Sequence, residues 1–188
     1  MSCVAPLVLA TIVTTLPLVV RVYDGAGVPS ATLERAHTAV NETLNSVGIR
    51  TIWRQCRGDL CADPPGRDEV IVRISKTGEQ GSRDRLGSSM VDVERQAGTL
   101  ATVYLDRVAW LASEARIDSG RLLGRAIAHE IGHLLLGTAS HACEGLMRAR
   151  WLTTELQRDW PPDWMLSALE GERMRSRLFA RGVPSTAR

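Results

Sequence analysis

Lysine is almost absent from this 188-residue chain, in which Lys76 is the only lysine among 23 basic residues. These are balanced by 21 acidic residues, and no run or stripe of positive charge occurs, which argues against a nucleic-acid partner. Internal repeats, linker-like stretches and low-complexity segments are also missing, so nothing divides the sequence into two domains. The 44% share of apolar residues is too high for a disordered chain, which leaves a folded domain as the class.

Charge is missing from the N-terminal segment, which is mostly apolar like the apolar region of an export signal. The basic residue that usually precedes such a region is absent, and no clear small-residue cleavage site follows. Prolines and threonines interrupt the segment at a length near the lower limit for a membrane span, so we expect no stable membrane insertion. We therefore expect residues 1–15 to direct export to the periplasm or the medium, and residues 16–188 to form a single domain.

Hydrophobic periodicity predicts an α/β order of elements. Short apolar runs between turn residues indicate strands, and apolar residues every three to four positions indicate helices. The expected strands span 16–24, 49–53, 69–74, 85–91 and 99–105, and the expected helices span 30–46, 119–136 and about 162–180. Asp118 or Ser119 can cap the second of these helices, and Gly98 is expected in the loop between the last two strands.

Cysteine is scarce too, and two of the four cysteines lie five positions apart, at Cys56 and Cys61. This spacing suits a small disulfide ring and differs from the two-residue gap of redox or zinc-ribbon pairs. A disulfide fits an exported protein. The tripeptide Arg57-Gly58-Asp59 inside the ring resembles an adhesion motif, and we interpret it as a solvent-exposed loop. Cys143 is left unpaired if Cys3 is removed with the export signal.

Histidine occurs only four times, yet His129, His133 and His141 lie within thirteen residues. Positions four apart on a helix share one face, so the imidazoles of His129 and His133 can bind the same Zn²⁺ ion. Glu130 adjoins them without needing to be a ligand, and its carboxylate can take a proton from an attacking water and pass it to a leaving amine. The alternative interpretation assigns no metal-binding or catalytic role and takes His129 and His133 as hydrogen-bonded histidines of the protein core. His37 lies apart from the cluster and is most simply a packing residue.

A catalytic zinc site usually has three protein ligands and one open position. His141 is the best third candidate because the helix can end at Gly137, where the chain turns and returns toward the metal. The competing ligands are Glu144, Cys143, Glu155 and Glu170. A more ordinary interpretation of Cys143 is a small residue packed beneath the site.

The segment 128–147 resembles the metzincin zinc peptidases, nearest to the matrixin and archaemetzincin-like pattern. The family signature is a zinc-binding HExxH helix, a glycine turn, a third histidine and a turn carrying a methionine. In this sequence the matching residues are His129, Glu130, His133, Gly137, His141 and Met147. The two intervals around the glycine are four residues long, where the family has three. His129 and Met147 are 18 positions apart, as in the matrixin-like branch.

The resemblance implies a metzincin-like α/β fold (α+β in the wider sense): a twisted, mainly parallel sheet with an antiparallel edge strand, the zinc helix, a methionine turn and a C-terminal helix. It also implies a Zn²⁺-dependent endopeptidase acting on peptides or proteins, with His129, His133 and His141 as ligands and Glu130 as general acid and base. Met147 and Gly137 would support the site. Relatives hold their substrate on the edge strand. The candidate for this strand is the run Thr99, Leu100, Ala101, Thr102, Val103 and Tyr104.

Two other functions remain open. An exported binding protein stabilised by zinc would hold the metal without turnover, and a metal-free adhesion module would use the Arg57–Asp59 loop. Three tryptophans at 151, 160 and 164 could wall a substrate cleft, although we favour a packing role beneath the C-terminal helix. Substrate preference and oligomeric state cannot be read from the sequence.

Overall fold

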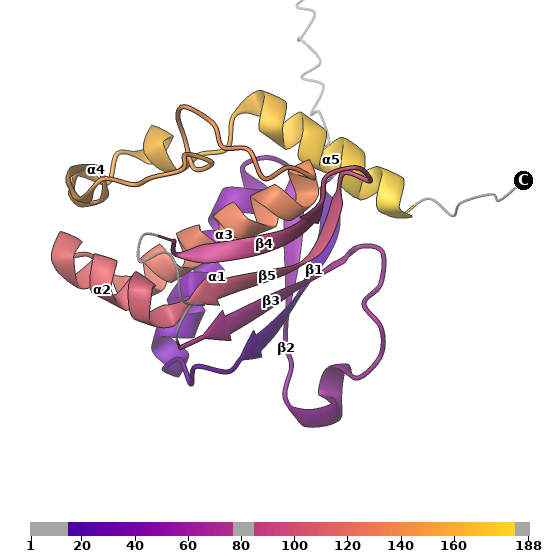
Figure 1. Ribbon diagram of the computed structural model, residues 1–188, viewed down its shortest axis with the longest axis horizontal. Coiled ribbons are helices and arrows are strands. Elements are labelled where there is room, and N and C mark those ends of the chain that lie inside the picture. The colour runs from indigo at the N-terminus through magenta and orange to yellow at the C-terminus, as the bar shows by residue number, and fades with distance from the viewer. Residues whose placement is uncertain (1–14, 77–84, 183–188) are drawn as a thin grey trace, which may run out of the picture.

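The computed structural model describes residues 15–76 and 85–182 and contains a five-stranded sheet in the order β2-β1-β3-β5-β4 (Figure 1). The strands are β1 (Leu16–Asp24), β2 (Ile49–Gln55), β3 (Glu69–Ser75), β4 (Gly87–Asp92) and β5 (Ala97–Tyr104). All neighbouring pairs are parallel except β4 and β5, which pair antiparallel. This arrangement confirms the predicted mixed α/β fold with a mainly parallel sheet and an antiparallel edge strand.

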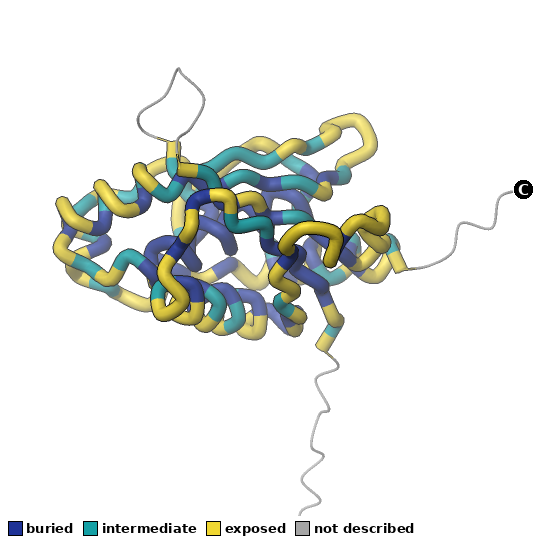
Figure 2. Tube along the Cα trace, turned by 90° about the horizontal axis from the view of Figure 1, so that it is seen from below, coloured by how far each residue is buried: buried dark blue, intermediate teal, exposed yellow. Residues whose placement is uncertain are grey.

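Helices cover one face of this sheet. The helical elements are α1 (Ser30–Asn45), α2 (Leu105–Ala115), α3 (Ser119–Leu136), α4 (Thr153–Arg158) and α5 (Ala168–Gly182), with short 3-10 turns η1 (Gly58–Cys61) and η2 (Pro161–Trp164). Helices α1 and α3 pack side by side behind the sheet, and their buried residues form one continuous interior with the strands (Figures 1 and 2). The exposed residues lie on loops and on the outer sides of the helices (Figure 2).

Helix α3 has clear start and stop signals. The Asp118 carboxylate accepts a hydrogen bond from the backbone N–H of Arg121 at 2.7 Å, which satisfies one of the free amides of the first turn. Gly137 ends the helix in the left-handed conformation with φ of 57°. Leucine, isoleucine and alanine side chains on several sides of α3 are fully buried, so the helix is a rigid platform for the residues it carries.

The prediction that residues 99–104 form the edge strand is wrong. Residues 99–104 belong to β5, which is paired with β3 on one side and with β4 on the other. Its backbone groups are therefore engaged within the sheet and are not available to an added strand. The edge strand is β4, and Gly98, expected in a loop, lies inside β5.

The C-terminal helix is shorter than predicted. The range 162–180 divides into the 3-10 turn η2 and the helix α5, which begins at Ala168. Ser167 starts α5 because its backbone N–H donates to the Glu170 carboxylate while its hydroxyl accepts from the Glu170 N–H. The carbonyl of Met165, just before this cap, accepts from Leu146, so the connecting segment is fixed to the loop that follows α3.

The structure joins Cys56 and Cys61 in a disulfide around η1, and the Arg57–Asp59 tripeptide in this ring is exposed. The loop is held to the sheet by the buried Arg21, which pairs with Asp63 at 2.7 Å and with Glu69. Within the described residues, no helix has the length and apolar character needed to cross a membrane. The predicted export segment, apart from Thr15, lies outside the described residues.

Candidate metal centre

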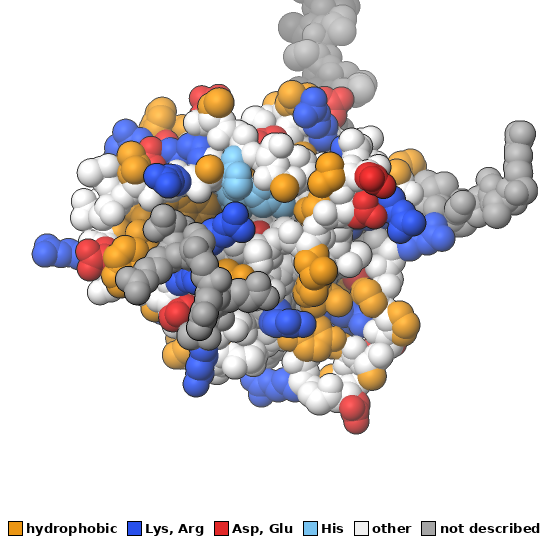
Figure 3. All heavy atoms as spheres, viewed as in Figure 1, with side chains coloured by type: hydrophobic (Ala, Val, Ile, Leu, Met, Phe, Trp, Pro, Cys, Tyr) orange, Lys and Arg blue, Asp and Glu red, His pale blue; other side chains and the backbone are white. Residues whose placement is uncertain are grey.

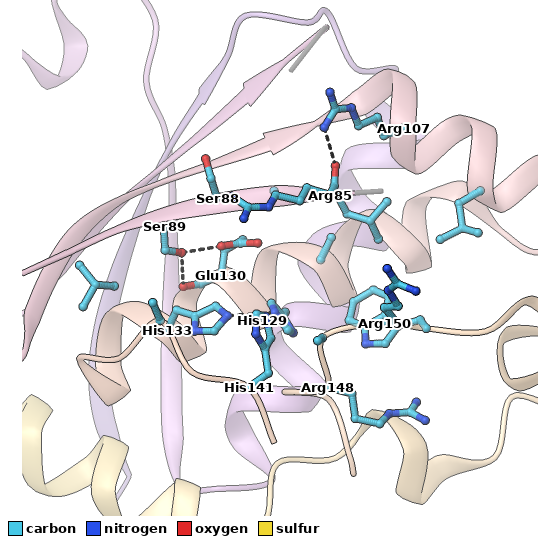
Figure 4. Close-up of a pocket in the computed structure, with 18 of the residues that line it drawn as sticks. Arg85, Ser88, Ser89, Arg107, His129, Glu130, His133, His141, Arg148 and Arg150 are labelled. Carbon is cyan, nitrogen blue, oxygen red and sulfur yellow. Dashed lines mark hydrogen bonds between the residues drawn. The ribbon is translucent and has the colours of Figure 1, made fainter. Parts of the chain in front are cut away.

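The three clustered histidines come together although they belong to two different segments. His129 and His133 lie one turn apart on α3, and the chain that turns at Gly137 brings His141 over them (Figure 4). The imidazole nitrogens that could serve as ligands all lie within 4.8 Å of one another. The competing third ligands have other roles or positions. Glu155 pairs with Arg148 at 2.5 Å, Glu170 caps α5, and Cys143 and Glu144 are exposed outside the group.

Hydrogen bonds fix the orientation of both helical imidazoles. His129 Nδ1 lies 2.9 Å from the Leu146 carbonyl oxygen, and His133 Nδ1 lies 2.8 Å from the Thr138 carbonyl oxygen. Because a carbonyl oxygen only accepts, both Nδ1 atoms carry the proton and both Nε2 atoms present a lone pair. These two Nε2 atoms are only 3.1 Å apart. Two facing lone pairs at this distance repel unless a cation or a proton lies between them, so the donor set fits a metal ion.

Burial keeps these histidines neutral. The pKa of His129 is lowered to about 4, chiefly by burial; the Leu146 carbonyl opposes the shift, and the neighbouring His133 and His141 add to it. Burial lowers the pKa of His133 and His141 as well. A neutral imidazole is the form that binds a metal, so the group is ready for a metal ion near neutral pH.

Glu130 lies beside the histidines and is held from the edge strand. The Ser89 hydroxyl on β4 lies 2.5 Å from Glu130 Oε2 and 2.9 Å from the Glu130 backbone carbonyl (Figure 4). Burial raises the pKa of Glu130 to about 7, against the opposing effects of the Ser89 hydrogen bond and the Arg85 charge. Gly87 on the same strand leaves room for this carboxylate, because a Cβ there would lie 2.7 Å from Glu130 Oε1. A carboxyl with this pKa can both accept and donate a proton near pH 7.

Met147 is buried against α3 at Gly132, which lies between Glu130 and His133 in the sequence. Its side chain is 1% exposed, and a Cβ on Gly132 would lie 2.5 Å from the Met147 sulfur, so glycine at this point of α3 allows the contact. The neighbouring Leu146 carbonyl accepts from both His129 Nδ1 and the Trp151 indole N–H. The loop after α3 thus holds the His129 imidazole through the Leu146 carbonyl. Cys143 is exposed, so its expected position beneath the site is wrong.

The histidines and Glu130 face an open cleft of about 660 Å³. Residues of the segments 85–91 and 148–152 line it on opposite sides (Figure 4), and Trp110 and Leu111 of α2 line it as well. Figure 3 shows the pale blue histidines at the surface of this hollow, with basic side chains close by. Of the three tryptophans discussed above, Trp151 lines the cleft, Trp164 is buried and Trp160 is exposed. The packing interpretation applies to Trp164 and in part to Trp151, which packs against the core and the Trp164 ring as well as lining the cleft.

Gly137 offers a test of the turn that returns the chain to the metal site. A Cβ here would lie 2.2 Å from the Gln96 carbonyl oxygen, and φ is 57°. We expect Gly137→Ala to lower the free energy of unfolding by about 2 to 4 kcal/mol, the sum of left-handed backbone strain and a clash with backbone. Gly27→Ala is the matched control, because Gly27 has φ of 72° with open space around it and should lose only about 1 kcal/mol. Equal losses in urea unfolding would show that the Gln96 contact is unimportant.

Sequence reasoning missed the residues that the edge strand supplies. Ser89, Gly87 and Arg85 lie more than forty positions before Glu130, and their approach depends on how β4 pairs with β5. The signal that could have found them is the small, polar composition of Gly87–Asp92, which is typical of an edge strand and not of a buried one.

No protein-family model matches the chain, and no curated protein matches it by sequence. Among solved structures, the chain is similar to the archaemetzincin of Methanopyrus kandleri, with a TM-score of 0.53 and 16% sequence identity. The match covers 91% of this chain and 99% of the archaemetzincin chain. At this identity the similarity shows a shared fold alone. In this chain the archaemetzincin-like fold carries a three-histidine group that could bind a metal.

Proposed function

We propose that this protein is a zinc-dependent endopeptidase of the metzincin type, with His129, His133 and His141 as the zinc ligands. The observation that supports it most strongly is the pair of facing Nε2 lone pairs 3.1 Å apart, completed by His141 and set beside a buried carboxyl in an open cleft. Three imidazoles with one side open to solvent are a common donor set of catalytic zinc. The archaemetzincin-like fold and the HExxH spacing support the same conclusion.

Zinc bound by these histidines would supply Lewis acidity, which polarises a peptide carbonyl and makes a water molecule more acidic. The chain supplies the proton transfers. Glu130 takes the proton from the attacking water and later donates it to the amine that leaves, because its carboxyl is buried beside the ligands and has a pKa near 7. Ser89 holds the carboxyl in place from the cleft wall.

The substrate would bind along β4. This strand pairs with β5 on one side only, so its other edge can accept an extended peptide by strand addition. The same strand holds Ser89, whose hydroxyl contacts Glu130, so a peptide paired with β4 passes the proton-transfer group. This proposal replaces the nominated β5 run and keeps the substrate class, an extended segment of a peptide or protein.

Met147 and Gly137 would support the site, with Met147 forming the methionine turn beneath the metal and Gly137 turning the chain toward His141. We also propose export from the cytoplasm. The disulfide at Cys56 and Cys61 supports an oxidising compartment.

The test is a metal analysis combined with a cleavage assay. We expect about one zinc per chain, hydrolysis of an unfolded protein substrate, loss of hydrolysis with a chelator and recovery when zinc is restored. Bound zinc without cleavage of any substrate in a broad peptide library would favour the second candidate, a zinc-stabilised binding protein. Absence of stoichiometric zinc would exclude both.

A further inference from the structure

The cleft is strongly basic. Its lining includes Arg85, Arg107, Arg148 and Arg150, while among the described residues that line it Glu130 alone carries a carboxylate. The whole chain has a net charge of only +2, so this concentration of arginine is a local property of the cleft. A cleft lined by charge of one sign raises the local concentration of ligands with the opposite charge.

Two of the four arginines, Arg107 and Arg148, already interact with other groups of the protein. Arg148 pairs with Glu155 at 2.5 Å and also donates to the Gly145 carbonyl. Arg107 donates to the Arg85 backbone carbonyl and its guanidinium lies over the Tyr104 ring at 4.9 Å. These contacts place both side chains in structural roles.

Arg85 and Arg150 differ from the other two. Both are exposed, and neither pairs with a carboxylate of the described residues. Arg85 immediately precedes β4 and extends along that wall above Glu130, while Arg150 rises from the opposite wall (Figure 4). The charge of Arg85 lowers the pKa of both Glu130 and His141, so Arg85 lies near the three-histidine group. The two guanidinium groups therefore lie on opposite walls of the channel that a peptide on β4 would follow.

We infer that Arg85 and Arg150 select substrates that carry a carboxylate next to the scissile bond. The inference rests on the proposed peptidase function and specifies its substrate class. Guanidinium groups bind carboxylates through charge-assisted, often paired hydrogen bonds, and an exposed arginine keeps this capacity for a ligand. The carboxylate can come from an Asp or Glu side chain or from the free C-terminus of a peptide.

The experiment compares matched peptides that differ only in charge. A cleaved library peptide is resynthesised with Glu, Gln or Lys at each position beside the scissile bond, and with a free or amidated C-terminus. We expect the Glu version, or the free-terminus version, to exceed its neutral counterpart about fivefold in kcat/KM, as for an exposed ion pair. The excess should fall when salt is raised from 0.05 to 0.5 M, because the screening length shortens.

Variants assign the effect to the two arginines. Arg85→Gln and Arg150→Gln should each reduce the preference to twofold or less, and Arg150→Lys should keep most of it. Arg173→Gln is the matched control, because Arg173 is an exposed arginine of α5 that does not line the cleft. It changes net charge equally and should leave the preference unchanged. A preference that persists in both cleft variants, or a parent that prefers neutral peptides, overturns the inference.

A binding measurement separates this inference from the proposed function. Labelled peptides of one library sequence, with Glu, Gln or Lys at a central position and with a free or amidated C-terminus, are titrated by fluorescence anisotropy into the parent protein, with and without zinc. If no peptide is cleaved but the carboxylate peptide binds about fivefold more tightly and loses this gain in Arg85→Gln and Arg150→Gln, the peptidase proposal fails and the carboxylate site stands. Equal affinity for the charged and neutral peptides overturns the carboxylate site whether or not peptides are cleaved.

Discussion

Replacing Glu130 with Gln is expected to lower kcat for peptide hydrolysis by about 10²- to 10⁴-fold with little change in KM. The amide has the shape of the carboxyl and can still accept a hydrogen bond from Ser89, which lies 2.5 Å from Glu130 Oε2. It cannot accept a proton from water. The loss should therefore appear in the chemical step and not in substrate binding.

The measurement is initial-rate kinetics on one fluorogenic peptide, with zinc content determined for both proteins. Equal zinc content with the expected loss of kcat assigns the proton transfer to Glu130, because the residue is not among the grouped ligands. A Glu130→Gln protein as active as the parent would exclude Glu130 as the general base.

The same variant has an independent signature in its stability. The pKa of Glu130 is raised from 4.5 to about 7, so between these pH values the folded protein binds more protons than the unfolded chain. Ionisation of Glu130 therefore lowers the stability of the metal-free parent by up to about 3 kcal/mol as pH rises from about 4.5 to 7. Glu130→Gln removes this titration. In urea unfolding of the metal-free proteins, the free energy of unfolding of the variant relative to that of the parent should therefore increase from pH 5 to pH 8.

The parts of the site that could be predicted from sequence are local in the chain. The zinc helix follows from its cap at Asp118, its apolar periodicity and Gly137, and the structure places its ends at the predicted positions. The geometry of a helix alone then places His129 and His133 on one face. The return of His141 required only a short turn at a glycine, which is why a pattern of a few residues was sufficient.

Strand order could not be predicted in the same way because it depends on pairing between distant segments. The run at 99–104 is the predicted edge strand, yet β5 pairs with a strand on each side and lies inside the sheet. Buried Ala101 and Val103 alternate with the less buried Leu100 and Thr102, and such an alternation shows which face is covered but not which strands pair with the two edges. The edge position belongs to β4, whose small and polar residues gave a weaker strand signal.

The interactions that shift the pKa of Glu130 could not be predicted from the sequence for the same reason. Ser89 contacts the carboxyl from β4, and Arg85, two residues before β4, acts on it through its charge, so both effects depend on a sheet pairing that sequence spacing does not encode. The basic cleft could not be predicted either, because the chain is rich in arginine and nothing in the sequence distinguishes Arg85 and Arg150 from the other arginines. Only the fold brings these two residues to the same cleft.

Removing zinc is expected to lower the free energy of unfolding by about 4 kcal/mol when free zinc is about a thousandfold above its dissociation constant. For a chain of this size the loss corresponds to a fall of about 10 °C in Tm. The physical reason is that zinc binds the folded ligand group and not the unfolded chain, and that it relieves the repulsion between His129 Nε2 and His133 Nε2. Thermal melts with zinc, with chelator and after zinc is restored measure the effect.

Two histidine variants make this test specific. His141 is exposed, so His141→Ala should change the metal-free Tm by little while removing most of the gain from zinc. His37→Ala is the matched control, because His37 lies outside the group and packs against Trp53 with ring centroids 4.9 Å apart. This variant should keep the full zinc gain. A gain that survives in His141→Ala would mean that zinc is held elsewhere or by two ligands only.

The zinc gain should also depend on pH in a direction set by the histidines. In the metal-free folded protein the pKa of His129 is lowered to about 4, while in the unfolded chain it is about 6.5. Between these values His129 binds more protons in the unfolded chain than in the folded protein, so the contribution of His129 to stability falls with falling pH, opposite in direction to that of Glu130. Zinc requires all three imidazoles to be neutral, so its contribution should be complete near neutral pH and should decline only where the lowered pKa values of the three histidines are reached. A zinc gain that is undiminished at pH 4, where His129 of the metal-free folded protein is about half protonated, would show that this imidazole is not a ligand.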